Sequence, residues 1–393
     1  SVQIAPATRP EHVVIQNLPI PLDDELAIGV LGRFARLNAI PSITWATKSI
    51  KSAFPSDDNV PALWLVAEAC GAHTADFTAK HSMIPVLYPV SPHAGSEREA
   101  NHRRHLAYIY GLGASAGGRR WCPRCAQIDH GDHGFAYWRR RHQINGIDWC
   151  PTHHIPLGIL AEESEISVPE QPPTLCHVAV SEMDLQNELA SSAIHRLQGI
   201  LLGWLHRPEP VHVRAWGDAV RERCHALDLR IGEVGKRPVT SDLILEHFPQ
   251  SWLKRHMPEV ASKQALAYIR KVDGACIDRH VAYPALACAA ILAVLFDSAE
   301  EALTTLDLAN RRIAAHGNAV DAATQALGAF LAGAGLHQAC RTFGAGMEDV
   351  ESLLRNRCSA AHELRSPDVL TERLVHLHLL GPEADARAYD NVG

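Results

Sequence analysis

Apolar residues recur along most of the chain at the spacing of one face of an α-helix. Leu26, Val30, Phe34 and Leu37 are three or four positions apart, and Asp23 or Asp24 precedes them as a candidate helix cap. The same kind of pattern predicts further helices, at residues 46–53, 60–71, 181–206, 241–248, 259–271, 280–296, 299–315, 318–333, 336–343, 347–357 and 368–380. The sequence therefore predicts a mainly α fold.

Changes in composition divide the chain into four segments. Residues 1–117 form a predicted N-terminal helical unit that contains a proline-rich loop at 84–100. Residues 118–160, which hold glycines, arginines and paired cysteines, form a predicted small ribbon. The acidic, proline-rich stretch 161–179 is typical of a linker. Residues 180–393 form a predicted C-terminal helical domain, and Ser181 with Asp184 is a candidate capping pair at its start.

The overall composition excludes some classes of protein. Hydrophobic residues make up 47% and charged residues 21% of the chain, which argues against wholesale disorder. The net charge of −7 differs from the basic balance of a typical freestanding DNA-binding protein, so a protein partner is favoured. The longest apolar run, Val281 to Phe296, has 16 residues, fewer than the roughly 20 that a membrane span needs. Mostly scattered cysteines and no signal peptide predict a cytoplasmic protein without membrane contact.

Two short cysteine motifs predict one zinc ion. Cys122-Pro-Arg-Cys125 and Cys150-Pro-Thr-His153 each offer two ligands from one tight turn, and 24 residues separate them. The alternative is two chance pairs of buried thiols; His154 could replace His153, and His130 or His133 could compete with it. Four protein ligands fill a tetrahedral zinc site, so the predicted ion is structural and not catalytic.

An excess of positive charge surrounds these motifs. Between Asn101 and Gln143 there are eight arginines and only two aspartates, a local balance of +6. Such a cluster can bind the phosphate backbone of DNA or of a guide RNA, or it can be a solvated face that pairs partly with the acidic linker. The candidate contact residues are Arg119, Arg120, Arg139, Arg140 and Arg141.

Motifs of common enzymes are missing from the sequence. There is no H-E-x-x-H, no P-loop, and no H-x-E upstream of the cysteines as in zinc deaminases. The arginine-rich stretch also lacks the paired acids of a metal-dependent nuclease. A metal-dependent hydrolase is therefore disfavoured, and the chain is predicted not to be an enzyme.

Three groups of residues resemble the TniQ/TnsD family of transposon proteins. The first is Pro21-Leu-Asp-Asp-Glu-Leu26, running into Gly29, Arg33, Ala35 and Asn38. The second is Trp121-Cys-Pro-Arg-Cys125. The third is Tyr137-Trp-Arg139 with His142-Gln143, followed by Trp149-Cys-Pro-Thr-His-His-Ile-Pro-Leu157. The resemblance covers residues 19–160. A second cysteine cluster found in many family members is missing, because Gly158 to Glu170 holds no cysteine and Cys176 stands alone.

The resemblance implies helix-turn-helix units flanking a zinc ribbon, with no catalytic activity. It implies a target-selection adaptor that works with the transposon's AAA+ regulator and transposase. Family members either sit on an RNA-guided CRISPR Cascade complex or bind an attachment site in target DNA, and the sequence leaves this choice open. The competing interpretation is a sequence-specific DNA-binding regulator with a zinc ribbon and a helix-turn-helix.

Two further features of the sequence leave alternatives open. Residues 323–357 have the layout of a helix-turn-helix or of an ordinary helical hairpin, and the acids Glu348, Asp349 and Glu351 disfavour a phosphate-facing third helix. The resemblance also implies a homodimer, for which the stripe from Leu26 to Leu37 and the C-terminal residues Trp252, Leu292, Leu295 and Phe296 offer apolar surface; a monomer is the alternative.

Overall fold

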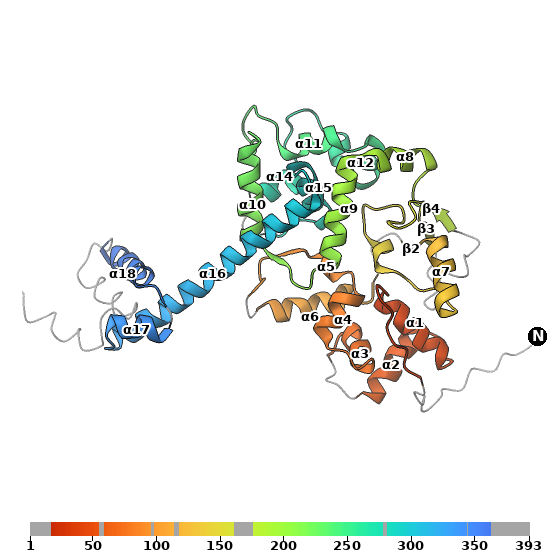
Figure 1. Cartoon of the computed structure of the whole chain (residues 1–393), viewed down its shortest axis with the longest axis horizontal. Coiled ribbons are helices and arrows are strands. Elements are labelled where there is room, and N and C mark those ends of the chain that lie inside the picture. Colours follow the sequence, from red (N-terminus) through yellow and green to blue (C-terminus); the bar gives the residue numbers. More distant parts are fainter. Residues whose placement is uncertain are drawn as a thin grey trace, which may run out of the picture. The chain divides into compact units, whose positions relative to one another are not determined.

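The computed structural model describes residues 17–54, 59–95, 98–113, 118–160, 176–277, 281–343 and 345–362. The chain divides into two compact units, residues 1–310 and 311–393, with the boundary inside one long helix. The described residues are mainly helical with little sheet, which confirms the predicted fold class (Figure 1). Within this described part, no helix has both the length and the apolar character of a membrane span.

The first unit begins with a group of short helices around one apolar core. Leu26, Val30 and Phe34 are at most 1% exposed within it, so three members of the predicted stripe pack inside their own chain, while Leu37 is 54% exposed. Helices α3 and α4 are joined by four residues that include Gly71, whose φ of +66° suits a tight turn, and so have the layout of a helix-turn-helix. The helices are α1 (Ala27–Leu37), α2 (Ile43–Ala53), α3 (Ala62–Ala69), α4 (Thr74–His81), α5 (Ile84–Leu87) and α6 (Arg98–Tyr110).

The predicted aspartate cap of the first helix is wrong. The N-cap residue of α1 is Leu26, which makes no capping bond through its side chain. Asp24 has a φ of +58° and its carboxylate instead accepts a hydrogen bond from Arg141 at 2.6 Å. The Asp24 carboxylate therefore binds a distant arginine, although the local sequence pattern predicted that it would cap α1.

A small antiparallel sheet follows the N-terminal helices. Its strand order is β2 (Arg119–Trp121), β3 (Gly158–Leu160) and β4 (Cys176–Val178), with Trp121 opposite Gly158 and Gly158 opposite Val178. Strand β4 lies inside the predicted linker 161–179, whose residues 161–175 are outside the described part. Between β2 and β3 the chain forms α7 (Pro123–His133) and the short 3-10 helix η1 (Arg140–Gln143).

The rest of the first unit is a second group of helices. Trp204, Trp216 and Trp252 are at most 2% exposed in its interior. A two-residue parallel pairing of β1 (Val90–Ser91) with β5 (Val211–His212) joins this group to the N-terminal helices. The helices are α8 (Glu182–Ala190), α9 (Ser192–Leu205), α10 (Val213–Ala226), α11 (Thr240–His247), α12 (Gln250–His256), α13 (Pro258–Ala261), α14 (Arg270–Asp273), η2 (Gly274–Cys276) and α15 (Ala285–Leu295).

The second unit contains the end of α16 (Ala299–Leu331), α17 (Leu336–Phe343) and α18 (Met347–His362). Ala326, Leu327, Ala339 and Val350 form its small core. These three helices have the predicted layout of residues 323–357, and Glu348, Asp349 and Glu351 are exposed on α18. The predicted helix at 368–380 lies outside the described residues.

Several predicted boundaries are wrong for identifiable reasons. The predicted helix 181–206 is two helices, because Ser191 adopts an extended conformation and caps α9 through the N–H of Ile194. The predicted helix 259–271 ends at Ala261, and Asp242 holds the following loop by accepting hydrogen bonds from Lys263 and from the Leu266 N–H. Two predicted helices, 299–315 and 318–333, are one, since a single interior glycine costs a helix only about 1 kcal/mol.

Candidate metal centre and its framework

The first cysteine motif forms where a strand becomes a helix. Cys122 follows β2 and is the N-cap residue of α7, and its sulfur accepts a hydrogen bond from the Cys125 N–H at 3.5 Å. Pro123 occupies the first turn of α7, where a missing N–H costs little. The sequence therefore turns Cys122 and Cys125 toward the same side of one helix start.

The second motif lies in a tight turn. The Cys150 N–H donates to the Ile155 carbonyl and the His154 N–H donates to the Cys150 carbonyl, both at 2.9 Å. His154 has a φ of +52°, so the chain reverses directly after His153. This turn presents Cys150 and His153 together and leaves His154 exposed.

The structure brings the four predicted ligands into one cluster. Cys122 and His153 are 3.4 Å apart, Cys125 and His153 3.3 Å, Cys150 and His153 3.5 Å, and Cys125 and Cys150 3.6 Å, measured between sulfur and Nδ1 or between sulfurs. A tetrahedral zinc site with bonds of about 2.3 Å to sulfur and about 2.0 Å to nitrogen spaces its ligand atoms roughly 3.5–3.8 Å apart. The arrangement fits zinc without further movement of the backbone. Within the described residues, no other group of three or more candidate ligands has such a geometry.

The cluster of candidate ligands is largely buried from solvent. The three cysteines are at most 5% exposed, and Leu157 packs against them. Hydrogen bonds from the thiols of Cys122 and Cys125 lower the pKa of Cys150, which favours its thiolate form. Because zinc binds thiolates, metal binding is expected to release the remaining thiol protons.

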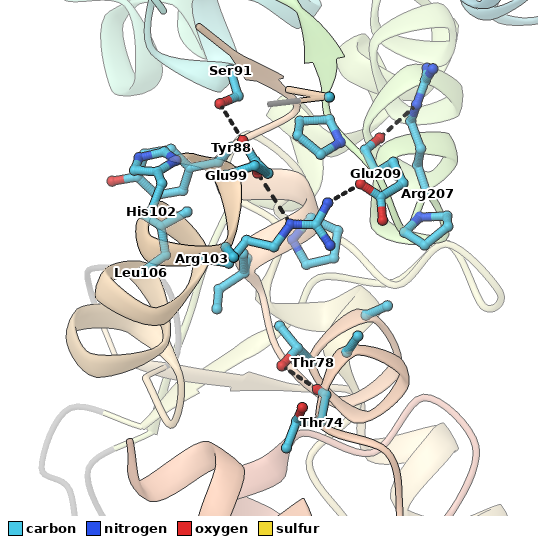
Figure 2. A pocket seen from close by; sticks show the side chains of 18 of the residues that line it. Thr74, Thr78, Tyr88, Ser91, Glu99, His102, Arg103, Leu106, Arg207 and Glu209 are labelled. Carbon is cyan, nitrogen blue, oxygen red and sulfur yellow. Dashed lines mark hydrogen bonds and ion pairs between the residues drawn. The ribbon is translucent and has the colours of Figure 1, made fainter. Parts of the chain in front are cut away.

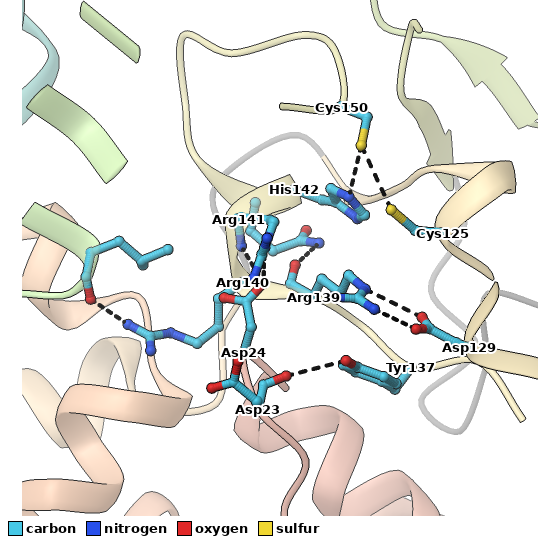
Figure 3. Close-up of polar contacts among 12 residues, drawn as sticks. Asp23, Asp24, Cys125, Asp129, Tyr137, Arg139, Arg140, Arg141, His142 and Cys150 are labelled. Carbon is cyan, nitrogen blue, oxygen red and sulfur yellow. Dashed lines mark hydrogen bonds and ion pairs between the residues drawn. The ribbon is translucent and has the colours of Figure 1, made fainter. Parts of the chain in front are cut away.

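The His142-Gln143 pair supports this cluster from the side. The Gln143 side chain accepts the Arg120 N–H at 3.0 Å and donates to the Arg120 carbonyl at 2.6 Å, like a strand partner for β2. It also donates to the Arg139 carbonyl at 3.1 Å. His142 lies beside Cys150, with Nε2 3.6 Å from the sulfur (Figure 3). The pair thus links the arginine-rich segment to both cysteine motifs.

Three of the five candidate arginines are buried. Arg119, Arg120 and Arg140 are 6%, 5% and 2% exposed. The Arg140 guanidinium donates to the carbonyls of Lys80 and Ser82 at the end of α4 and of Leu205 at the end of α9. Burial lowers its pKa to about 10, so it keeps its charge at neutral pH. Arg120 donates to the Ile147 carbonyl at 3.1 Å and forms an ion pair with Asp148.

The other two candidates, Arg139 and Arg141, are half-buried and paired. Arg139 forms an ion pair with Asp129 of α7, and Arg141 with Asp24 (Figure 3). Contact of the five arginines with nucleic acid stays a prediction, and their burial and internal pairing weigh against it. Their acidic partners come from the N-terminal segment and from α7, and the acids of the predicted linker lie outside the described residues.

The N-terminal motif packs directly against this segment. The Leu26 N–H donates to the Trp138 carbonyl and the Arg140 N–H to the Asp24 carbonyl, both at 2.8 Å. Glu25 is fully buried and binds Arg33 at 2.6 Å. A side chain at Gly29 would press on Glu25 at 3.3 Å and approach Trp138, so a residue without a side chain fits here. The first and third family motifs are therefore two sides of one interface.

A charged network joins the ribbon to the C-terminal helices of the first unit. Asp148, only 5% exposed, accepts from His256 at 2.7 Å and from Arg255 at 3.2 Å. Arg255 also pairs with the buried Glu188 of α8. Sequence analysis missed these acids because their partners lie more than sixty residues away along the chain.

A separate cavity of ≈ 430 Å³ lies between the N-terminal helices and the segment after α9 (Figure 2). Thr74 and Thr78 of α4 face it on one side, and Arg103 of α6 crosses it to reach Glu99 and Glu209. The cavity is thus bordered by paired charges and small or apolar side chains. No sequence motif indicated it, because its residues come from segments far apart in the chain.

A comparison with known proteins matches the same part of the chain. None of the curated proteins searched matches the chain. The model of the TniQ family matches residues 18–157, the part that holds the N-terminal motif, both cysteine motifs and the buried arginines. The chain therefore contains, over these residues, a domain of the TniQ/TnsD family of proteins that select targets for transposition.

Proposed function

We propose that this protein is a non-enzymatic adaptor that links a target-bound complex, such as an RNA-guided Cascade, to the transposition machinery. The TniQ match over residues 18–157 carries this proposal. The arginines that could have formed a basic surface on the ribbon bind carbonyls and carboxylates of their own chain. This internal use supports a protein or ribonucleoprotein partner on the target side, and the AAA+ regulator and transposase on the other side.

The metal centre has a structural role in this proposal. Cys122, Cys125, Cys150 and His153 hold one zinc ion, which supplies a cross-link between the β2–α7 junction and the 150–153 turn. Four protein ligands leave no position for a reacting water, in agreement with a protein that does no chemistry. The cross-link holds η1 and its arginines between the two groups of helices.

A homodimer is part of the proposal, with its interface on exposed surface. Leu26, Val30 and Phe34 are buried in the first unit, as are Trp252, Leu292, Leu295 and Phe296. These side chains are therefore not available to a second chain. Exposed apolar side chains such as those of Leu37, Ile109 and Met183 offer better candidates.

A transposition assay in cells tests the adaptor function. The transposase, AAA+ regulator and target-recognition genes that accompany this chain's gene are expressed with a marked transposon, with and without the chain. Insertions at the selected target require the chain, and the purified chain binds one or more of these partners. Targeted insertion at full frequency without the chain would refute the proposal.

Direct binding of DNA is the second candidate, and helix α2 favours it. The stretch 33–54, which includes α2, contains four basic residues and no acid. Trp45 and Lys48 are exposed on α2, with the Lys48 ammonium 5.2 Å from the centre of the Trp45 ring. Nanomolar binding of the pure chain to the target sequence, lost in Lys48→Glu, would favour this candidate. Targeting that depends on a partner, with no binding of the pure chain to the target sequence, would favour the adaptor.

A further inference from the structure

His142 is buried against one of the four candidate metal ligands. Its Nε2 lies 3.6 Å from the sulfur of Cys150, and the two residues are 2% and 0% exposed (Figure 3). His142 is not one of the four residues whose ligand atoms gather around a common centre. It therefore contacts the cluster from outside.

The backbone that carries His142 is held on both sides. The next residue, Gln143, makes three hydrogen bonds to the backbone of Arg120 and Arg139. The preceding Arg140 binds carbonyls at the ends of α4 and α9. Because η1 is fixed by these bonds, the position of the imidazole beside Cys150 is set by the framework and not by the metal.

The negative charge of a zinc-loaded site favours a hydrogen-bond donor beside the cysteine sulfurs. Three thiolates and a neutral imidazole around Zn²⁺ carry a net charge of about −1, which is costly in a buried place without hydrogen-bond donors. The sulfur of Cys122 receives the Cys125 N–H at 3.5 Å. A metal-bound thiolate only accepts hydrogen bonds, so the atom of His142 that faces Cys150 must be an N–H.

We propose that His142 donates its Nε2–H to the Cys150 thiolate and is a positioning residue of the metal centre. The inference rests on the proposal that the cluster holds zinc. The hydrogen bond lowers the charge on the sulfur, slows its reaction with electrophiles and slows loss of the metal. It also gives the His-Gln pair two separate tasks, since Gln143 holds the strand and His142 holds the ligand.

Cobalt substitution and zinc competition in the full chain test this inference. His142→Phe and His142→Met remove the donor, while His142→Gln keeps an N–H at a similar distance from the backbone. Loss of the donor is expected to lower zinc affinity about 10-fold or more. It is also expected to move the sulfur-to-cobalt charge-transfer band to lower energy and to speed alkylation of Cys150. His142→Gln should restore most of each property, and His105→Asn, at an exposed position of α6 outside the metal centre, should change none.

Selective ¹⁵N-histidine labelling of the zinc-loaded wild-type chain shows directly which ring nitrogen carries the proton. The signal of His142, identified by its loss in His142→Gln, should show the proton on Nε2. A proton on Nδ1 alone, or cobalt spectra and alkylation rates equal in wild type and His142→Phe, would overturn the inference. If the wild-type chain binds no metal, the zinc proposal itself fails; if it binds metal and only these differences are missing, the role of His142 alone fails.

Discussion

Arg140 bonds the ends of two helices from different parts of the chain, and replacing it with methionine tests the importance of this contact. Its guanidinium donates to Ser82 at 2.9 Å and to Leu205 at 2.8 Å, and also to Lys80. The carbonyl ends of helices carry partial negative charge and lack partners in the helix. A buried cation therefore satisfies carbonyls at both helix ends, and two of them, those of Ser82 and Leu205, belong to fully buried residues.

The expected loss of stability follows from these three bonds. Each hydrogen bond from a charged donor contributes about 1.5–3 kcal/mol, and leaving a buried carbonyl unpaired costs about 1–3 kcal/mol. Methionine fills much of the volume and removes the cost of burying a charge, which offsets part of the loss. We expect Arg140→Met to lower the free energy of unfolding of the first unit by about 3–5 kcal/mol.

Urea unfolding followed by tryptophan fluorescence measures this change. All eight tryptophans lie between positions 45 and 252, so the signal reports on the first unit alone. Zinc is kept in excess so that the metal centre stays loaded. Arg214→Met, at an exposed position of α10, is the matched control and should change stability by less than about 0.5 kcal/mol. A loss of under about 1 kcal/mol in Arg140→Met would refute the assigned role of the guanidinium, because leaving the two buried carbonyls of Ser82 and Leu205 unpaired cannot cost so little.

The remaining predictions concern metal, chemistry, pH and assembly. Purified protein should contain one zinc per chain. Cys122→Ser or Cys150→Ser should lose metal and solubility together, whereas His154→Asn should keep both. A wild-type chain that is folded without metal would contradict this prediction. Incubation of pure protein with DNA and divalent metals should give no cleavage; cleavage abolished by a point mutation in the chain would show an enzyme. Burial lowers the pKa of His81, so the contribution of this residue to stability is complete above about pH 6.5 and is lost as the pH falls from there toward the folded pKa. We therefore expect His81→Asn to flatten the fall in the urea midpoint between about pH 7 and 5. An unchanged slope would count against this role of His81. Light scattering should give twice the single-chain mass of 43.0 kDa, and a single-chain mass would exclude the dimer.

The sequence predicts helices well where a strong apolar stripe meets a local end signal. The Ser181–Asp184 cap of α8 is confirmed, with the Asp184 N–H donating to Ser181 at 3.2 Å, and α17 has the predicted bounds. Helix α10 was missed although Trp216, Val220 and Cys224 form a recognisable buried stripe. Helices α6 and α7 are harder, because few of their residues are buried and tertiary contacts stabilise them.

The candidate site also has a part that the sequence predicts and a part that it does not. The cysteine motifs are local, and their spacing alone predicts which four residues come together. The partners of the arginines are not local: Arg141 binds Asp24, 117 positions away. Charge counted along a sequence window cannot tell a basic surface from a buried network, because burial depends on the fold of distant segments. The local balance of +6 therefore suggested a basic surface, whereas in the structure the five candidate arginines are buried or paired inside the chain.

This framework changes what the family motifs imply about function. Glu25, Trp138, His142, Gln143 and Cys150, drawn from the first and third motifs, are at most 3% exposed. Together with those of Arg140, their contacts run between α1, the ribbon, and the ends of α4 and α9, so they hold one arrangement of helices in place. Residues of this kind give a shared fold and cannot themselves distinguish one target or partner from another. We therefore expect partner choice to depend on exposed residues outside the motifs, such as Trp45 and Lys48 of α2. Substitutions there should change which partner or target is bound while zinc content and stability stay constant; substitutions in the motifs should change stability first and targeting only as a consequence.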